Sequence, residues 1–252
     1  MNQKDLKEYL DFKANQFECP SFIENDPIQI PHRYTKKEDI EIAAFFMASL
    51  AWGNRLSILK SGDRLMELFG DAPFNFIMDY DSLKPIPFVH RTFNGIDLTF
   101  FCRSLKYLYQ NKEGLEGAFS NLDENETGLK VRISNFRTAF LETTHEQRSE
   151  KHISNPLKNS ACKRLVMFVR WMVRSSEKGV DFGLWNHISK SELYVPLDVH
   201  TGNVARNLGI LKRKQNDWKT NDELIRKLRK LDAEDPAKYD FALFGIGVNK
   251  EL

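Results

Sequence analysis

The sequence has 252 residues, of which 41% are hydrophobic and 12% aromatic, so the chain is not disordered throughout and can bury a core as one large domain or two small ones. Lysine and arginine number 37 against 35 aspartate and glutamate residues, which gives a formal net charge of +2. This near-neutral total argues against a dedicated nucleic-acid-binding protein, since such proteins usually carry a basic excess.

Sorting signals and metal-binding patterns are lacking in the sequence. The N-terminal segment MNQKDLKEYLDFKANQF has no uninterrupted apolar stretch typical of a signal peptide. No segment approaches the ~18 apolar residues of a membrane span. Cys19, Cys102 and Cys162 are odd in number, far apart and in no CxxC pair, which predicts free thiols rather than disulfides or a metal site. We therefore expect a cytoplasmic protein with no membrane segment, metal or cofactor.

Helix signals begin with a capping box at Thr35–Glu38, with Tyr34 as its hydrophobic staple. An almost wholly apolar helix follows over residues 38–52, and a helix of that kind belongs in the centre of a fold. Further helices are predicted over residues 56–69 and over residues 97–109, the latter capped by its first residue, an aspartate.

The C-terminal half continues the helical pattern. Helices are predicted over residues 128–141, 161–174 and 201–208. A capping box at Thr220–Glu223 precedes another helix, and Asp235-Pro236 starts the last one because proline suits the first helical turn.

Alternating strand patterns are scarce, and no internal repeat is found. The sequence therefore predicts an all-α protein of two packed helical lobes. One lobe is expected to contain residues 36–145, and the other residues 1–35 together with 146–252.

The charge is segregated along the chain. Residues 1–150 hold 18 basic and 23 acidic residues, a net charge of −5. Residues 151–214 hold 12 basic and 4 acidic residues, a net charge of +8, and residues 215–252 hold 7 and 8. The +8 stretch is either a region that binds a polyanion or a solvated face of a helical protein.

The predicted helix ACKRLVMFVRWMVR places several of these basic residues on one face. At about 100° per residue, Lys163, Arg170 and Arg174 share one face and the apolar residues the opposite one, which predicts an exposed basic stripe. Lys163 lies near the positive N-terminus of this helix, beside Arg164. A lysine among cations loses its proton more readily, which prepares an amine nucleophile. The alternative is an ordinary surface lysine.

A second feature is the segment PLDVHTGNVARNLG, in which Asp198 stands at the start of a short helix. Aspartate is a favoured N-cap, and Asp198 can be no more than that. A capping carboxylate can also serve in catalysis, because the amide hydrogen bonds favour its charged form. His200, Asn203 and Arg206 follow at three-residue spacing, so they share a helix face that can meet phosphates.

These two segments resemble the helix-hairpin-helix DNA glycosylase superfamily, which contains endonuclease III and the 8-oxoguanine glycosylases. PLDVHTGNVARNLGIL is similar to the segment V-D-x-H-x-x-R-V that holds the essential aspartate of that superfamily. SACKRLVMFVRWMVR is similar to its second hairpin helix, whose early lysine is the nucleophile of the bifunctional members. The resemblance implies the two-lobed helical fold of these glycosylases, with Lys163 and Asp198 as the catalytic pair.

A weaker similarity lies in MASLAWGNR, which occupies the place of a helix end that lines the base pocket in that superfamily. It implies Asn54 as a polar pocket residue and Trp52 as a stacking surface, although plain core packing would also explain Trp52. Nearly the whole chain also resembles a bacterial family of unknown function, through pieces such as DPIQIPHRY, RTFNGIDL, KNSACKR and KYDFALFGIG.

The sequence departs from the superfamily at the hairpin. The turn is normally L-P-G-V-G, because a side chain would obstruct the approach to a DNA phosphate. Residues 155–160 read NPLKNS without glycine, so Lys158 and Ser160 are the candidates to replace it. The separation of 35 residues between Lys163 and Asp198 exceeds that in endonuclease III and compares better with the archaeal 8-oxoguanine glycosylases. The iron–sulfur cysteines of endonuclease III are absent.

The resemblance implies a base-excision N-glycosylase that extracts a damaged base from DNA. Lys163 would attack the sugar, Asp198 would stabilise the positive charge that develops, and the Schiff base could then lead to strand cleavage. DNA is the implied partner, and no obligate protein partner is inferred. Two alternatives stay open: a catalytically inactive nucleic-acid-binding module of the same fold, and an unrelated all-α interaction protein. The implied DNA contacts are Lys158, Ser160, Arg170, Arg174, His200, Asn203 and Arg206.

Overall fold

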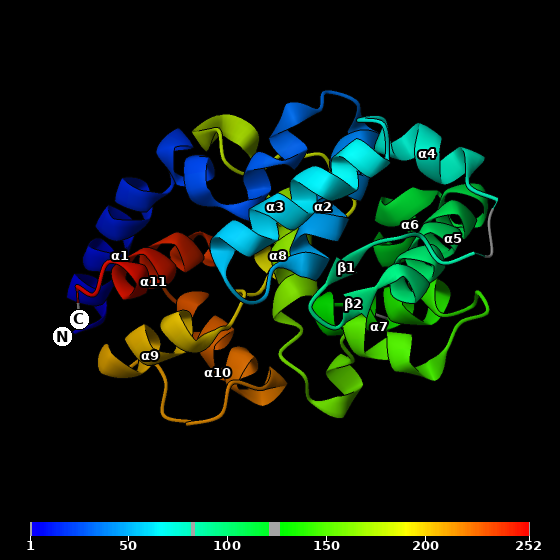
Figure 1. The fold of residues 1–252 in the computed structure, drawn as a ribbon. Helices are drawn as coiled ribbons and strands as arrows, with labels where there is room; N and C mark the ends of the chain where they lie inside the picture. The colour runs from blue at the N-terminus through cyan, green and yellow to red at the C-terminus, as the bar shows by residue number, and fades with distance from the viewer. Residues whose placement is uncertain (1, 82–83, 121–126, 252) are drawn as a thin grey trace. The chain divides into compact units, whose positions relative to one another are not determined.

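The computed structural model describes residues 2–81, 84–120 and 127–251 (Figure 1). α-Helices dominate these residues, and the only strands among them are β1 (Val89–His90) and β2 (Phe93–Asn94), which form an antiparallel hairpin. The protein is therefore all-α. Within the described ranges, no helix is both long and apolar enough to cross a membrane.

The chain divides into two compact units. Unit 1 contains Met1–Phe22 and Pro156–Leu252, and unit 2 contains Ile23–Asn155. The boundaries differ from the expected ones, because residues 23–35 and 146–155 belong to unit 2 rather than to the discontinuous lobe.

Unit 2 is built around α2, a helix that is buried at every residue from Ile40 to Leu50. Its apolar sequence leaves no polar face, so other helices must cover it on several sides. Phe45 of α2 lies 5.7 Å from the ring of Phe101 and 5.5 Å from the ring of Phe140, measured between centroids. The helices of this unit are α2 (Lys37–Leu50), α3 (Arg55–Leu68), α4 (Pro73–Asp79), α5 (Gly95–Asn111), α6 (Gly114–Ser120) and α7 (Leu129–Phe140).

Two helix starts in unit 2 differ from the prediction. The capping box at Thr35 is wrong: the N-cap of α2 is Lys36, without a side-chain hydrogen bond. In α5 the N-cap is Asn94 and not Asp97, which instead occupies the third helical position and accepts from the Asn94 backbone amide at 2.9 Å. The hairpin β1–β2 delivers Asn94 in an extended conformation, so the helix starts earlier than residue 97.

Unit 1 packs its helices around α11, and α1 and α9 both lie against it (Figure 1). α1 was not predicted. A Cβ atom at Gly245 would lie 2.2 Å from the ring of Phe17, so glycine permits the close approach of α1 to α11. The helices of unit 1 are α1 (Gln3–Phe17), α8 (Lys163–Val173), α9 (Val199–Asn207), α10 (Trp218–Leu228) and α11 (Tyr239–Val248).

Two helix starts in unit 1 also need correction. Asp217 and not Thr220 caps α10, and its carboxylate accepts from the Thr220 amide at 2.8 Å and the Thr220 hydroxyl at 2.9 Å. Thr220 therefore helps to cap the helix from inside its first turn. Asp235-Pro236 starts a 3₁₀ turn, Pro236–Lys238, after which α11 begins at Tyr239.

Candidate active site in unit 1

The turn before Lys163 takes a left-handed conformation at two residues that are not glycine. The φ angle is 61° at Asn159 and 48° at Cys162, and Lys163 is the first residue of α8. Asparagine tolerates this region better than most residues, because its short polar side chain can hydrogen-bond locally. The turn thus reaches, without glycine, a backbone conformation that glycine usually provides.

Hydrogen bonds from the start of α10 hold this turn in place. The Asn159 side-chain amide donates to Asp217 at 2.9 Å, and the Asn159 carbonyl accepts from the amide of Trp218 at 3.1 Å. The Asn159 side-chain oxygen accepts from the amide of Lys219 at 3.2 Å. Ser160 also accepts through its hydroxyl from the amide of Cys162 at 3.2 Å. One side chain therefore connects the start of α8 to the start of α10.

Asp198 is the N-cap of α9, as predicted. Its carboxylate accepts from the Thr201 amide at 3.0 Å, and its carbonyl accepts from the side-chain amide of Asn216 at 2.8 Å. The residue is partly exposed. The cap fixes one oxygen of the Asp198 carboxylate by this hydrogen bond.

Lys163 and Asp198 both act on one buried carboxyl group, that of Asp240. Asp240 lies on α11 with 7% of its surface exposed, and burial raises its pKa to about 6. The positive charges of Arg170 and Lys163 oppose that rise, whereas the negative charge of Asp198 adds to it. The pKa of Asp240 is thus influenced by both Lys163 and Asp198, which are 35 residues apart in the sequence.

The surroundings of Lys163 differ from those expected. Arg164 follows Lys163 in the sequence, but the charge of Lys163 also interacts with the carboxyl group of Asp240. Lys163 therefore has an acidic group in its surroundings as well as a cation. Its Nζ atom lies 3.4 Å from the sulfur of Met167, one turn along α8, and the residue is partly exposed.

Sequence reasoning missed Asp240. The available signal was a lone carboxylate in the apolar helix YDFALFGIGV, because a charged residue is rarely buried unless it is paired.

The predicted basic stripe on α8 is wrong. Arg170 is 2% exposed and Arg174 is 4% exposed, so neither is a surface cation. Arg170 forms ion pairs with Asp240 and, at 3.4 Å, with Asp181. Helical spacing correctly places the two arginines on one face, but it does not reveal which other segments cover that face.

Arg174 is even more fully neutralised. It pairs with Glu18 at 2.5 Å, with Asp181 at 2.7 Å and with Asp235 at 2.9 Å. These carboxylates raise the pKa of Arg174 against the effect of burial. The three carboxylates lie at the end of α1 and in the loops before α9 and after α10. A pattern within α8 therefore does not predict these ion pairs. Both arginines consequently hold unit 1 together.

The other predicted DNA contacts have different surroundings. Lys158, His200 and Asn203 are exposed, and Ser160 is partly exposed. Arg206 is partly buried and donates to the carbonyls of residues 213–215, so it organises a loop and is not a free surface cation.

Trp52 and Asn54 belong to unit 2. Asn54 caps α3 by accepting from the Ser57 amide at 3.2 Å, and it lines an open pocket together with Lys60 and Arg64. The ring of Trp52 faces the guanidinium of Arg91 at 4.8 Å. The grouping of Lys163, Asp198 and Asp240 is therefore a property of unit 1 alone.

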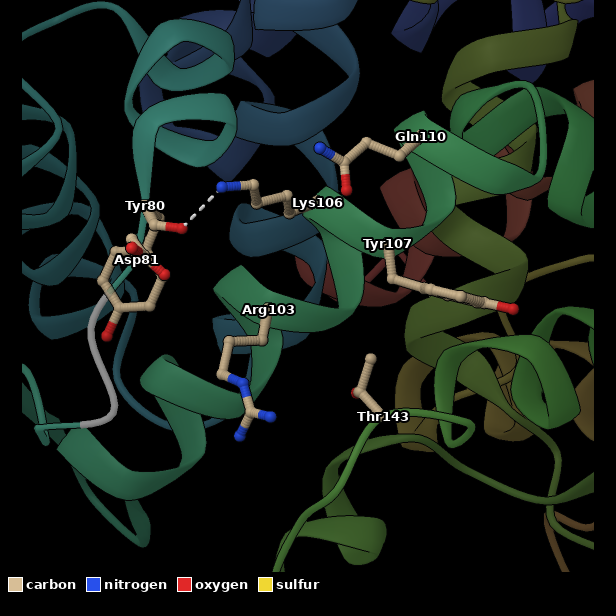
Figure 2. Close-up of a pocket in the computed structure, with 7 residues that line it drawn as sticks. All are labelled: Tyr80, Asp81, Arg103, Lys106, Tyr107, Gln110 and Thr143. Carbon is tan, nitrogen blue, oxygen red and sulfur yellow. Dashed lines mark hydrogen bonds between the residues drawn. The ribbon is translucent and has the colours of Figure 1, made fainter.

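Another pocket of unit 2 lies beside α5, and the sequence did not point to it (Figure 2). Figure 2 shows the Lys106 ammonium group donating to the Tyr80 carbonyl, at 3.0 Å. The Arg103 guanidinium donates to the Thr144 carbonyl at 3.3 Å, so both cations already have partners. The lining residues are Tyr80, Asp81, Arg103, Lys106, Tyr107, Gln110 and Thr143.

No group of three or more metal-ligating side chains occurs among the residues that the structure describes. Searches of curated proteins and of solved structures each found no match. A scan of protein families matches residues 26–249 to a family described as a protein of unknown function, DUF2400. This match spans most of the length of the chain, and the chain therefore belongs to the DUF2400 family.

Proposed function

We propose that this protein is a DNA N-glycosylase of the helix-hairpin-helix superfamily, with Lys163 as nucleophile and Asp198 as its acidic partner. The observation that carries the proposal is the position of these two residues. Lys163 opens α8 after a tight turn, Asp198 caps α9, and their charges meet at the buried carboxyl of Asp240. A lyase-type glycosylase requires a lysine amine as nucleophile and a carboxylate to assist it, and both residue types contribute to the electrostatic surroundings of Asp240.

The chemistry follows from these groups. The Lys163 amine, in its neutral form, attacks the anomeric carbon of the flipped nucleotide, and the glycosidic bond breaks with its electron pair going to the base. The base takes up a proton as it leaves. The Asp198 carboxylate stabilises the cationic sugar in the transition state. Loss of a proton from the nitrogen and opening of the sugar give a Schiff base, from which β-elimination releases the 3′ phosphate.

The structure reduces the set of residues that we propose as DNA contacts. Lys158, His200 and Asn203 remain candidates, since their side chains are exposed, and Ser160 remains one through its hydroxyl. Arg170 and Arg174 are not among these contacts, because both are buried and their charges are compensated by buried carboxylates. Backbone contacts of this kind fix the position of DNA and carry no sequence information by themselves.

One observation favours the inactive binding module as a second candidate. The hydrogen bond that the Asp198 carboxylate accepts from the Thr201 amide accounts for an aspartate at this position without catalysis. The same fold and the same exposed cations would then serve binding alone.

Borohydride trapping distinguishes the two candidates. Duplexes that contain 8-oxoguanine, uracil, thymine glycol, an alkylated purine or an abasic site are incubated with the protein and sodium borohydride. We expect a covalent adduct that is lost in Lys163→Gln and kept in Lys190→Gln, an exposed lysine of the same unit. Tight DNA binding without adduct or base release would establish the binding module instead. Base release that persists in Lys163→Gln would remove Lys163 as the nucleophile.

A further inference from the structure

The loop between α9 and α10 has a basic sequence and a well-defined conformation. Residues 211–217 read LKRKQND and form no helix or strand, yet the Arg206 guanidinium donates to three of their carbonyls in succession. The distances are 2.7 Å to the Arg213 oxygen, 2.8 Å to the Lys214 oxygen and 3.4 Å to the Gln215 oxygen. The carbonyls of this loop therefore point toward α9.

Asn216 closes the loop on α9. Its side-chain oxygen accepts from Arg206 at 2.5 Å, and its side-chain nitrogen donates to the Asp198 carbonyl at 2.8 Å. A Cβ atom at Gly202 would lie 2.7 Å from the Asn216 side-chain oxygen and 2.9 Å from the Arg206 guanidinium. Glycine at position 202 thus leaves the space in which the loop and Arg206 meet.

Two of the three cations of this loop are exposed lysines. Lys212 and Lys214 are exposed, and neither ammonium group forms an ion pair within the part of the chain that the structure describes. Arg213 differs, because it pairs with Asp217 at 2.7 Å and donates to the Thr220 hydroxyl at 2.9 Å. Arg213 therefore anchors the loop, whereas Lys212 and Lys214 are available to a ligand.

The loop is also joined to the turn before Lys163. Asp217, the last residue of the loop, accepts from the side chain of Asn159, and Ser160 pairs with Asp217 through the backbone. The turn before Lys163, which follows Lys158, and the loop that carries Lys212 and Lys214 are therefore joined by hydrogen bonds. Exposed cations on adjoining loops suit a ligand with regularly spaced negative charges.

We infer that the loop of residues 212–216 is a second contact with the phosphate backbone of DNA, with Lys212 and Lys214 as its phosphate ligands and Arg206 as the residue that positions them. This inference rests on the proposed function, because it takes DNA as the ligand. It adds a surface that the resemblance does not imply, and it gives Arg206 a role through the loop and not through direct contact.

Salt dependence of binding to an undamaged duplex of about 20 base pairs tests the inference. Each phosphate neutralised contributes about 0.9 to the slope of log K against log salt, so Lys212→Gln/Lys214→Gln should reduce the slope by about two. The matched control is Lys190→Gln/Lys230→Gln, which removes two exposed lysines of the same unit. An unchanged slope in the loop variant would overturn the inference, whereas no binding by the wild-type protein would overturn the proposed function as well.

Arg206→Lys tests the positioning role, since it keeps the charge but cannot reproduce the parallel hydrogen bonds to the loop carbonyls. We expect weaker duplex binding and faster amide exchange confined to residues 212–217. In the Lys212→Gln/Lys214→Gln background, the same change should have no further effect on binding, because Arg206 acts through those lysines. Full additivity of the two losses would instead assign Arg206 a separate role and overturn this part of the inference.

Discussion

Arg170 and Asp240 form a buried ion pair that joins α8 to α11 within unit 1. Asp240 is also the group at which the charges of Lys163 and Asp198 meet. An arginine expected to face DNA therefore stands instead beside the carboxyl group that neighbours the proposed catalytic pair. Arg170 also pairs with Asp181, whose side chain is fully buried. The arginine therefore compensates the charges of two carboxylates.

The first prediction concerns stability. Replacing Arg170 with methionine leaves the carboxyl groups of Asp181 and Asp240 with less compensation, and we expect a loss of about 3–5 kcal/mol in the free energy of unfolding. Urea denaturation measures it. Lys190→Met, on an exposed lysine, should change the free energy by less than about 0.5 kcal/mol. If Arg170 were a DNA contact, Arg170→Met would leave the urea midpoint unchanged and weaken duplex binding.

A second prediction concerns pH. Burial raises the pKa of Asp240 to about 6 from its ordinary value of 3.8, so between these values the folded state binds more protons than the unfolded state. Its contribution to stability is therefore fully present below about pH 4 and is lost as the pH rises through 6. Asp240→Asn removes this dependence, because asparagine cannot ionise.

The measurement compares unfolding free energies of the wild type and of Asp240→Asn from pH 4 to pH 7. The advantage of the wild type over the variant should shrink by about 2 kcal/mol across this range. A difference that stays constant with pH would contradict the raised pKa. Asp198→Asn offers an internal check, since removing that negative charge should lower the pKa of Asp240.

The sequence predicted those features of the site that depend on neighbours along the chain. The helix expected over residues 161–174 is observed as Lys163–Val173, and Asp198 is the N-cap of α9. Both depend on local rules, the period of an amphipathic helix and the capping preference of aspartate. The predominance of helices was predictable for the same reason.

The features that depend on distant segments could not be predicted in this way. Two of the carboxylates that pair with Arg174, those of Glu18 and Asp235, lie 156 and 61 residues away in the sequence. Asp240 is 70 residues from Arg170. Local reasoning also misplaced the start of α10, because Asp217 outcompetes Thr220 as the cap.

A third prediction concerns the turn that precedes Lys163. Asn159 has a φ angle of 61° and hydrogen-bonds to Asp217 and Lys219. Asn159→Gly keeps the backbone conformation and loses only the side-chain hydrogen bonds, whereas Asn159→Ala loses the bonds and also strains the backbone. We expect the alanine variant to be less stable than the glycine variant by about 1 kcal/mol. Thermal denaturation measures the difference, and equal stabilities would show that the turn relaxes at no cost.

The last prediction separates the two roles of Asp198. Asparagine caps a helix about as well as aspartate, so Asp198→Asn should keep the hydrogen bond to the Thr201 amide and leave stability within about 0.5 kcal/mol. Asp198→Ala loses the cap and should cost about 1 kcal/mol. If the carboxylate stabilises a cationic sugar, both variants should lose the borohydride adduct, although only one loses stability. Retention of the adduct in Asp198→Asn would reduce Asp198 to a helix cap, since the capping hydrogen bond alone would then suffice for Lys163 to react.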